Sequence, residues 1–370
     1  MTTRSPLILS IVGARPQFVK IAPFCRAAAV SSLNHEVIHT GQHYHYDMSE
    51  GFFEELGIKK PLVNLGVGSG SHGLQTGRML EKLEKLFGEL QPNYIIVYGD
   101  TNSTIAASLA ASKMMIPIAH AEAGQRSYRR DMPEEINRVV TDVLASLLFT
   151  TGELASATLV REGRTKEEIV MVGDLMYDAF LLFRGQTSPS EQLSDLLEIK
   201  EDFILATFHR AENTDDPIKL QIIVNALTEI ALSSRIIIPL HPRTKKMLDK
   251  YKISFANCPN LIIIDPVGYR DILELLAHCS LVITDSGGLQ KEAYFAEKRS
   301  LILRKETEWA ELAQSGWVRL MPEDSSECIV DLIRKLQNED SSLLARDPSW
   351  FGNGDSAAKM IHTLESKLVS

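Results

Sequence analysis

Three acidic side chains in the first half of the chain form a pattern that suits general acid–base catalysis. Asp100 ends the run YIIVYGD, Glu122 lies in HAEAGQRS, and Glu134 lies in MPEEINR. The cations Arg126 and Arg138 lie near them in the sequence. Acids that share a site with cations can have their pKa values set apart by burial and by neighbouring charges, as proton transfer requires. Each acid alone could equally cap a helix or face solvent, but as a set in strand-end segments they predict catalysis.

The segment TDSGGLQKEA has the features of a phosphate-binding turn. An apolar run ends at Asp285, and Gly287 and Gly288 allow close approach of the backbone. An amphipathic helix is expected to begin directly after Ser286, and exposed amide groups at a helix start bind phosphate or diphosphate. The alternative is an ordinary turn capped by Asp285 or Ser286. Arg304, at the end of the next apolar run, favours the anion or nucleotide site.

Further cationic side chains also follow expected strands. Arg15 and Lys20 bracket a helix start in GARPQFVK, where a guanidinium would suit a diphosphate. The alternative is a pair of surface cations near a helix end. His209 and Arg210 lie in ATFHRAEN, and His241 lies in PLHPR. A lone histidine is usually structural, but two such segments facing one cleft predict contacts to a leaving phosphate.

Two other motifs resemble sites that we do not predict. His39, His43 and His45 in HTGQHYH resemble a metal cluster, but no carboxylate follows at ligand spacing, and no metal is expected. GSGSHG at 68–73 matches the dinucleotide fingerprint GxGxxG literally. It does not follow the first strand of a βαβ unit, so NAD is rejected and a flexible, glycine-rich active-site loop is the better interpretation.

Strand-like and helix-like segments alternate along the whole chain, which predicts α/β architecture with parallel sheets. The expected strands are 7–13, 36–41, 94–100, 116–124, 147–151, 169–174, 202–209, 235–242, 260–268, 281–288 and 300–306. The expected helices are 16–29, 73–90, 103–115, 136–148, 218–232, 270–278, 289–296 and 356–369. In such sheets ligands bind beyond the carboxyl ends of the strands, which is where the unusual polar residues fall.

A chain of 370 residues is too long for one ordinary core, so two doubly wound, Rossmann-like domains of similar size are expected. The polar block 181–197 is the best linker candidate. The predicted domains are therefore 1–180, completed by a C-terminal helix at 356–370, and 181–355, with a ligand cleft between them.

Composition narrows the class of protein. The net charge of −9 gives no general electrostatic reason to bind nucleic acid or an anionic membrane. The four cysteines are scattered, which predicts reduced thiols and a cytoplasmic protein. No stretch reaches the ~18 apolar residues that a spanning helix needs. The apolar run at 6–12 suits a first strand and not a signal peptide.

The motifs together resemble the UDP-N-acetylglucosamine 2-epimerase family of the bacterial non-hydrolysing type. GARPQFVK, HTGQH, GDTNST, HAEAGQRS, PEEINR, FHRAEN, LHPR, TDSGGLQKEA, LRKET and WFGNGDSAA occur in the family's order over nearly the whole chain. The resemblance implies a fold like that of the GT-B glycosyltransferases, with the last helix crossing back onto the N-terminal domain. It also implies an isomerase that eliminates UDP to a 2-acetamidoglucal and adds it back, with no redox or metal cofactor, and a homodimer.

The resemblance carries residue roles over by motif. Asp100, Glu122 and Glu134 become the acid–base candidates on the sugar side. His209 and Arg15 would stabilise the departing diphosphate. The residues expected to hold the ribose, the phosphates and the uracil are Ser286, Gly287, Gly288, Glu292, Arg304 and the backbone near Tyr269. The remaining expected contacts to the UDP-sugar are Lys20, Gln42, Arg138, Arg210 and His241.

Some segments depart from the family's commonest form. Gln17 stands where the family has glutamate, and Ala211 stands where it has a second arginine. An Arg-Gln-Thr stretch that the family links to allosteric binding of a second UDP-sugar is replaced in the region of GSGSHGLQTG. GARPQF, MPEEINR and ETEWAEL are closer to the branch that acts on UDP-2,3-diacetamido-2,3-dideoxyglucuronic acid. Arg78, Arg129 or Arg130 could pair with the carboxylate of that sugar.

Three other functions remain open at this point. A GT-B glycosyltransferase would share the nucleotide site, but the acids Glu122 and Glu134 argue against it. A hydrolysing epimerase would differ in its products and not in its fold. A catalytically inactive UDP-sugar sensor is disfavoured because the acids and His209 are all present.

Overall fold

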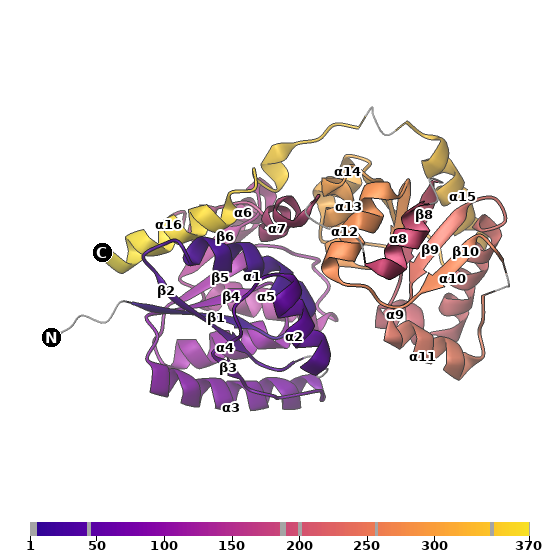
Figure 1. Ribbon diagram of the computed structural model, residues 1–370. Coiled ribbons are helices and arrows are strands. Elements are labelled where there is room, and N and C mark those ends of the chain that lie inside the picture. The colour runs from indigo at the N-terminus through magenta and orange to yellow at the C-terminus, as the bar shows by residue number, and fades with distance from the viewer. Residues whose placement is uncertain are drawn as a thin grey trace. The chain divides into compact units, whose positions relative to one another are not determined.

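The computed structural model describes residues 6–42, 46–185, 190–198, 202–255, 258–340 and 344–369. The chain forms two compact units, one of Met1–Leu182 with Asp347–Ser370 and the other of Phe183–Arg346. Each unit has a parallel sheet with helices packed against it (Figure 1). The predicted α/β class with two Rossmann-like sheets is confirmed.

The first unit contains a seven-stranded sheet in the order β3-β2-β1-β4-β5-β6-β7. All of its neighbouring strands are parallel. Because β1 lies between β2 and β4, the order of the strands reverses at β1, and sheets of this kind bind ligands beyond the carboxyl ends of the strands at such a point. The strands are β1 Leu7–Val12, β2 Asn34–His39, β3 Val63–Asn64, β4 Tyr94–Tyr98, β5 Ile118–Ala123, β6 Leu147–Thr150 and β7 Ile169–Met171.

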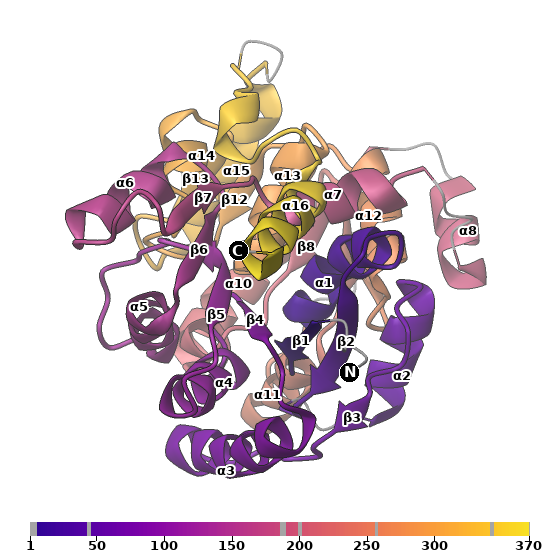
Figure 2. The same ribbon diagram turned by 90° about the vertical axis from the view of Figure 1, so that its left-hand side faces the viewer.

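Helices cover both faces of this sheet, with α3 and α4 on one side and α1 and α16 on the other (Figure 2). The apolar runs of the central strands are buried from both sides, as in other parallel sheets. The helices are α1 Arg15–Ala28, α2 Tyr46–Glu55, α3 His72–Leu90, α4 Asn102–Lys113, α5 Pro133–Leu144, α6 Glu153–Arg161, α7 Leu175–Phe183 and α16 Ser356–Val369, with a short 3-10 turn at Pro348–Trp350.

The C-terminal helix α16 belongs to the first unit, where it packs beside α1. Its first amides are bound by Asp178 of α7, whose carboxylate oxygens accept from the N–H of Ser356 at 3.2 Å and of Ala357 at 2.8 Å. Burial raises the pKa of Asp178 above its ordinary value, although these donors act in the opposite direction. A side chain from the middle of the chain therefore anchors its last helix.

The second unit has a six-stranded parallel sheet in the order β10-β9-β8-β11-β12-β13. The order reverses at β8, the first strand of this sheet, so the carboxyl end of β8 is the expected place for a ligand. The strands are β8 Phe203–Thr207, β9 Arg235–Pro239, β10 Leu261–Ile264, β11 Leu281–Thr284, β12 Ser300–Ile302 and β13 Val318–Leu320. The helices are α8 Glu191–Glu198, α9 Ala211–Thr214, α10 Pro217–Ile230, α11 Pro242–Tyr251, α12 Tyr269–His278, α13 Gly287–Phe295, α14 Ala310–Gln314 and α15 Ser326–Asn338.

Most predicted strands ran too far at their carboxyl ends. The residues that follow the strands as turns, loops or helix starts are 99–100, 172–174, 208–209, 240–242, 265–268, 285–288 and 303–306. The predicted helix at 136–148 was also misplaced, because α5 begins at Pro133 and ends at Leu144. Glu134 and Glu135 therefore lie in the first helical turn and not in a loop. The polar block 181–197 is partly helical, since α7 enters it and α8 occupies its second half.

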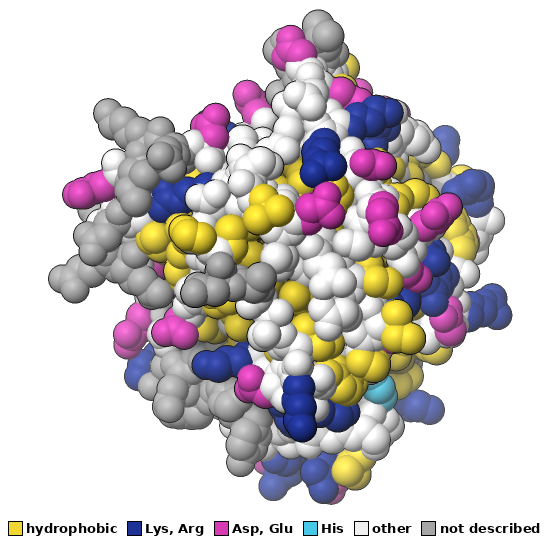
Figure 3. Space-filling model, turned by 90° about the vertical axis from the view of Figure 1, so that its right-hand side faces the viewer, with side chains coloured by type: hydrophobic (Ala, Val, Ile, Leu, Met, Phe, Trp, Pro, Cys, Tyr) yellow, Lys and Arg dark blue, Asp and Glu magenta, His cyan; other side chains and the backbone are white. Residues whose placement is uncertain are grey.

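Two surface features agree with the composition. In the part of the chain that the structure describes, no helix is long and apolar enough to cross a membrane. On the face shown in Figure 3, acidic and basic side chains are interspersed rather than gathered by sign. Such a face offers no single-sign field that would attract a polyanion.

Candidate active site

Gln17 joins the carboxyl ends of β1 and β4 in the first unit. Its side-chain oxygen accepts from the N–H of Gly13 at 2.8 Å and of Ala14 at 3.1 Å. Its amide nitrogen donates to the carbonyl of Tyr98 at 2.8 Å and to the hydroxyl of Thr104 at 3.2 Å. Gln17 is buried, and an ionised glutamate could accept the first two bonds but could not donate the others. The departure from the family at this position thus has a structural use, which the sequence alone did not reveal.

Glu122 lies in an irregularity near the end of β5. The register between β5 and β6 shifts between Ala121 and Ala123, and Glu122 has a φ of +73°. Positive φ is unfavourable for a residue with a side chain and persists where the surrounding structure enforces it. The bulge turns the Glu122 carboxylate out of the alternation of the strand, toward the edge where β1 and β4 end.

Lys20 of α1 forms a close ion pair with Glu122, and the two side chains are 12% and 13% exposed. The sequence predicted Lys20 as a contact to UDP, but its ammonium in the structure is directed at the carboxylate. Gly99 follows β4 beside this pair with a φ of +61°. A Cβ at Gly99 would lie 3.2 Å from the Lys20 nitrogen and 3.3 Å from a Glu122 oxygen, so a larger residue would crowd the pair.

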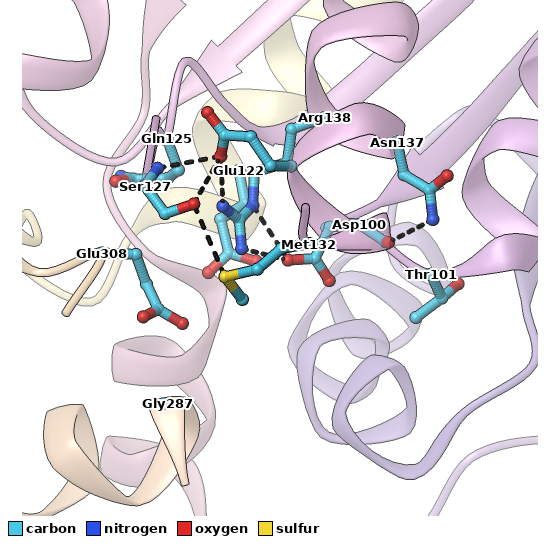
Figure 4. A network of polar contacts seen from close by, with 12 residues as sticks. Asp100, Thr101, Glu122, Gln125, Ser127, Met132, Asn137, Arg138, Gly287 and Glu308 are labelled. Atoms are coloured by element: carbon cyan, nitrogen blue, oxygen red, sulfur yellow. Dashed lines mark hydrogen bonds and ion pairs between the residues drawn. The ribbon is translucent and has the colours of Figure 1, made fainter. Parts of the chain in front are cut away.

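Arg138 of α5 holds Asp100, another of the three candidate acids. Its Nε donates to Asp100 Oδ2 at 2.9 Å, and its Nη2 lies 2.7 Å from the same oxygen. Its Nη1 donates to Glu135 at 2.8 Å. Asn137 donates to the backbone carbonyl of Asp100 at 2.8 Å, which fixes the turn as well as the side chain. Figure 4 shows the side chains of Asp100, Glu122 and Arg138 converging on one place at this edge of the sheet.

The two adjacent glutamates of α5 have different environments. Glu135 is buried and accepts from the N–H of Ser127 at 2.8 Å and of Tyr128 at 2.9 Å, besides Arg138. Its four acceptor contacts, including the Ser127 hydroxyl, fix the loop before α5. Glu134 is half-buried, and its carboxylate makes no hydrogen bond or ion pair with any residue that the structure describes. Glu134 is therefore the acid left available to a ligand.

The sequence suggested that Arg126 lies beside the candidate acids Asp100, Glu122 and Glu134, but the structure pairs it with two other carboxylates. It is buried, with Nη2 2.7 Å from Asp142 and 2.6 Å from Glu162. Burial alone would lower the pKa of Arg126, but the two carboxylates outweigh it and raise that pKa. Asp142 in turn contacts His120, with 2.6 Å between Oδ1 and Nδ1. His120 and Asp142 are site residues that the sequence analysis missed.

Arg15 and Gln42, both predicted contacts to the substrate, lie at the same carboxyl edge. The Arg15 guanidinium stacks 4.2 Å from the ring centroid of Phe52. Burial lowers the pKa of Arg15 from its ordinary value, while Glu55 acts against this. The Gln42 side-chain oxygen accepts from the N–H and hydroxyl of Ser103 at 3.0 and 2.7 Å, so it also supports the start of α4.

In the second unit, Asp285 holds the segment after β8. Its buried carboxylate accepts from the N–H of His209 at 3.0 Å, from the N–H of Arg210 at 2.9 Å and from Asn213 at 3.0 Å. His209 Nδ1 lies 3.5 Å from the other oxygen. The N-cap of α13 is Ser286, which accepts from Leu289. Asp285 is therefore not the cap, and it ties β11 to the His209–Arg210 segment.

The turn into α13 is built for close approach. A Cβ at Gly287 would lie 2.7 Å from a Glu308 oxygen, so a larger residue there would displace the Glu308 carboxylate. Trp309 donates its indole N–H to the Gly287 carbonyl at 3.1 Å, and the buried ammonium of Lys291 lies 3.9 Å from a Trp309 ring centroid. Neither Trp309 nor Lys291 was singled out from the sequence.

Arg304 lies at the end of β12, as predicted, and is 3% exposed. It donates to Glu308 at 3.0 Å, and its Nε lies 3.3 Å from Glu212. Its Nη2 is buried and has no hydrogen-bond partner among the described residues. A buried, unsatisfied guanidinium donor is costly unless a ligand accepts from it.

The other predicted contacts in this unit belong to two helices. Tyr269, the first residue of α12, is buried and packs edge-to-face on Phe183 with 5.9 Å between ring centroids. Glu292 is buried within α13.

The histidine-rich motif HTGQHYH and the glycine-rich motif GSGSHG have structural roles in the parts that the structure describes. His39 is buried, and its Nδ1 accepts from the N–H of Gly41 at 2.8 Å. His43 and His45 lie outside the described residues. Among the residues described, no group of three potential metal ligands is present. The glycine-rich segment 68–73 leads into α3, whose N-cap is Ser71, and does not follow β1 as a dinucleotide turn would.

A cavity of about 540 Å³ in the second unit lies at the opposite, amino edge of its sheet. Phe203, Arg235, Ser280 and Arg299 line it near the starts of β8, β9, β11 and β12. Its arginines already have protein partners, since Arg299 pairs with Glu339 at 2.5 Å and Arg235 donates to a backbone carbonyl. The candidate site is therefore not this cavity but the carboxyl edge, which the polar residues described above face.

Comparison with known proteins assigns these elements to a common architecture. The sequence profile of a family described as UDP-N-acetylglucosamine 2-epimerase matches residues 26–365. A UDP-N-acetylglucosamine 2-epimerase homolog of Methanococcus maripaludis is 45% identical over 97% of this chain and 99% of its own length. A UDP-2,3-diacetamido-2,3-dideoxy-D-glucuronate 2-epimerase of Pseudomonas aeruginosa is 42% identical over 96% and 99%.

The fold has a similarly close match among solved structures. The Methanocaldococcus jannaschii UDP-GlcNAc 2-epimerase, crystallised in complex with UDP-GlcNAc and UDP, superposes with a TM-score of 0.90 at 38% identity, covering 97% of this chain and 99% of the other. A Neisseria meningitidis UDP-GlcNAc 2-epimerase bound to UDP-GlcNAc gives 0.86 at 26% identity, covering 97% and 100%.

Proposed function

The chain belongs to the UDP-N-acetylglucosamine 2-epimerase family, and from that premise we propose how its side chains invert carbon 2 of a UDP-2-acetamido sugar. The enzyme is a non-hydrolysing UDP-sugar 2-epimerase, an isomerase. The hydrogen on carbon 2 is not acidic in the substrate, since no carbonyl group adjoins it. Cleavage of the anomeric carbon–oxygen bond gives oxocarbenium character that acidifies this hydrogen. A base removes this proton as UDP departs, which leaves a 2-acetamidoglucal with a double bond between carbons 1 and 2. Carbon 2 is then protonated on the other face, and UDP adds back to carbon 1.

The acids of the first unit supply the proton transfers. The observation that carries this proposal is the contrast between Glu134, whose carboxylate has no partner among the described residues, and Asp100 and Glu122, which cations hold in place. A catalytic acid or base must reach the substrate, so a carboxylate without protein partners at the crevice suits that role. Asp100 and Glu122, which Arg138 and Lys20 hold in place, make the other proton transfers of the reaction.

The second unit binds the UDP portion. The amides of Gly287 and Gly288 at the start of α13 suit the diphosphate, and the unsatisfied Nη2 of Arg304 suits an anionic oxygen. His209, whose backbone Asp285 fixes, stabilises the negative charge that develops on the departing diphosphate. The UDP-GlcNAc and UDP bound by the M. jannaschii relative support a UDP-sugar as the ligand.

The sugar is either UDP-N-acetylglucosamine or the diacetamido-glucuronic acid derivative, and one observation bears on the second. Arg129 pairs with Asp131 at 2.5 Å, while Arg130 is exposed and makes no ion pair with any described residue. Glu135 accepts from the N–H of Tyr128, two residues before Arg130, and so holds the loop that carries Arg130. A free guanidinium there suits the extra carboxylate of a uronic acid. The 42% identity to the P. aeruginosa enzyme supports that substrate.

Incubation with each UDP-sugar in heavy water, followed by proton NMR, tests the proposal. Deuterium should enter at carbon 2 while UDP stays attached, and the substrate that exchanges identifies the sugar. Release of free sugar would instead indicate a hydrolysing epimerase. No exchange with either substrate, despite bound UDP, would refute the proposed chemistry and favour a glycosyltransferase, which a transfer assay with candidate acceptors would detect.

We also propose a cytoplasmic homodimer. Ile136, Val139 and Val143 form an apolar stripe on α5 with exposed fractions of 49%, 36% and 64%. The spacing i, i+3, i+7 puts them on one face of the helix, which a second copy could cover. Sedimentation should give the mass of a dimer for the native protein and of a monomer for Val143→Glu.

The free cysteines support a reducing compartment such as the cytoplasm.

A further inference from the structure

His120 of β5 has an acceptor at each of its two ring nitrogens. It is fully buried at 0% exposure. Nδ1 lies 2.6 Å from Asp142 Oδ1, and Nε2 lies 2.8 Å from the backbone carbonyl of Gly99. A carbonyl oxygen can only accept, so Nε2 must carry a hydrogen.

The other nitrogen meets an oxygen whose carboxylate is ionised. Oδ2 of Asp142 accepts from the N–H of Gly124 at 3.1 Å and lies 2.7 Å from Nη2 of Arg126. Burial alone would raise the pKa of Asp142, but His120 and Arg126 outweigh it and lower that pKa. The bonding proton therefore lies on Nδ1 and not on the carboxyl group.

We propose that His120 is a positioning residue, whose ring donates to both Asp142 and the Gly99 carbonyl and thereby fixes the backbone around two of the catalytic carboxylates. This inference rests on the proposed function for the identity of those carboxylates. It does not assign His120 any contact with the substrate.

The charged groups that face one another around the pair are His120 on β5, Asp142 on α5, Arg126 in the loop after β5 and Glu162 after α6. The Glu162 side chain is 37% exposed, so Asp142 and Arg126 are the charges buried beside His120. Their ion pair of 2.7 Å keeps the Asp142 carboxylate in place as the acceptor for His120.

The pair acts on both sides of the Glu122 bulge. His120 Nε2 binds the carbonyl of Gly99, the residue directly before Asp100. Asp142 binds the N–H of Gly124, two residues after Glu122. Gly99 and Gly124 both have positive φ, at +61° and +82°, so the pair braces two turns that would otherwise be free to relax. Displacement of either turn would move a carboxylate away from its cation.

Nitrogen NMR of protein labelled with ¹⁵N-histidine tests the protonation state without any measurement of activity. The His120 ring should show two protonated nitrogens at pH 8.5, well above the range in which exposed histidines lose their second proton. In Asp142→Asn, the ring should become neutral at the same pH. A wild-type spectrum with one bare nitrogen on His120 would overturn the proposal, even if the protein lacked epimerase activity altogether.

Kinetics in heavy water test the positioning role. His120→Asn should lower kcat for exchange at carbon 2 by about a hundredfold and change KM by less than about threefold, because the UDP contacts lie in the other unit. Asp142→Asn should lose activity at pH 8 and regain part of it at pH 6, where its histidine is protonated. His362→Asn, on the exposed face of α16, is the matched control and should behave as wild type.

Two results would contradict this role. One is wild-type kcat in a folded His120→Asn protein. The other is a uniform loss in Asp142→Asn with no recovery at lower pH. If His120→Asn does not fold, Asp142→Asn and the wild-type spectrum still decide the question. If wild type shows no exchange with any UDP-sugar, the proposed function fails while the spectrum still reports on His120.

Discussion

The imidazole rings of His209 and His241 stack, with 4.8 Å between their centroids and 25° between their planes. His241 Nδ1 accepts from the N–H of Arg243 at 3.1 Å and so caps α11. The cap fixes the ring of His241 against that of His209, whose Nδ1 lies 3.5 Å from Asp285.

His241→Asn and His241→Ala separate the stacking of His241 from its capping. Asparagine retains a good N-cap, whereas alanine loses it at a cost of ~1 kcal/mol in unfolding free energy. Both variants lose the stack, and we expect both to slow exchange at carbon 2 about tenfold, or ~1.4 kcal/mol in the barrier. Urea unfolding and heavy-water NMR measure the two effects. An Asn variant with wild-type exchange would show that the stack has no part in catalysis.

Glu134→Gln and Glu135→Gln should give opposite results although the residues are adjacent. Glu134 has no protein partner among the described residues, so its replacement should change stability by less than ~0.5 kcal/mol but slow exchange by ~10²–10⁴-fold. Glu135 accepts from Arg138 and from two backbone amides, so its replacement should cost ~2–4 kcal/mol of stability. Urea unfolding beside exchange kinetics checks both. A stable, active Glu135→Gln together with an unstable Glu134→Gln would reverse the assignment.

Thiol reactivity reports on two cysteines, the half-buried Cys25 and the buried Cys279. Burial raises the pKa of Cys25 and of Cys279 from 9.0 to about 12. A rise of about three units lowers the thiolate fraction at pH 8 about a thousandfold, and the thiolate is the form that reacts. Iodoacetamide should therefore leave both unmodified in the folded protein, as peptide mass spectrometry can show. In urea all four cysteines should react alike, and rapid labelling of Cys279 without urea would contradict the prediction.

The anchoring of α16 should depend on pH with a defined sign. The folded-state pKa of Asp178 is raised by burial, so the folded protein binds this proton more tightly than the unfolded chain. Stability from Asp178 is then greatest at low pH and falls as pH rises from the ordinary value of 3.8 through the raised one. The difference in unfolding free energy between wild type and Asp178→Asn should follow this trend. A difference that grows with pH would mean that the amide donors of α16 outweigh burial.

The sequence predicts the class of fold because short apolar runs alternate with longer amphipathic segments along the whole chain. It gave no signal for α11, where only Thr244 and Leu248 are buried in a polar segment. In α15 a usable signal was overlooked, since Ile329, Ile333 and Leu336 recur at helical spacing. Strand ends were overestimated because the segments that carry the site continue the apolar runs without a break in composition.

The site is less predictable because it depends on contacts between distant segments. His120 and Asp142 are 22 residues apart, and nothing local marks them as partners. The roles of Glu134 and Glu135 depend on the rotation of α5 about its axis. Here a signal existed, because Glu135, Arg138 and Asp142 recur at i, i+3 and i+7 and so share the inward face. The bulge that turns Glu122 outward is a property of the backbone, and the residue types do not indicate it.

Lys20 offers the sharpest test of a role, because the sequence and the structure suggest different ones. In the structure its ammonium pairs with Glu122, so Lys20→Met should leave that carboxylate without its cation. A carboxylate that loses a cation is protonated at higher pH, and the acidic limb of the kcat profile should move upward. Lys20→Arg keeps the charge and should hold the limb near its wild-type position, while calorimetry should find UDP affinity unchanged in both variants. If instead Lys20→Met loses UDP affinity and keeps the wild-type pH profile, Lys20 is the diphosphate contact that the motif predicted.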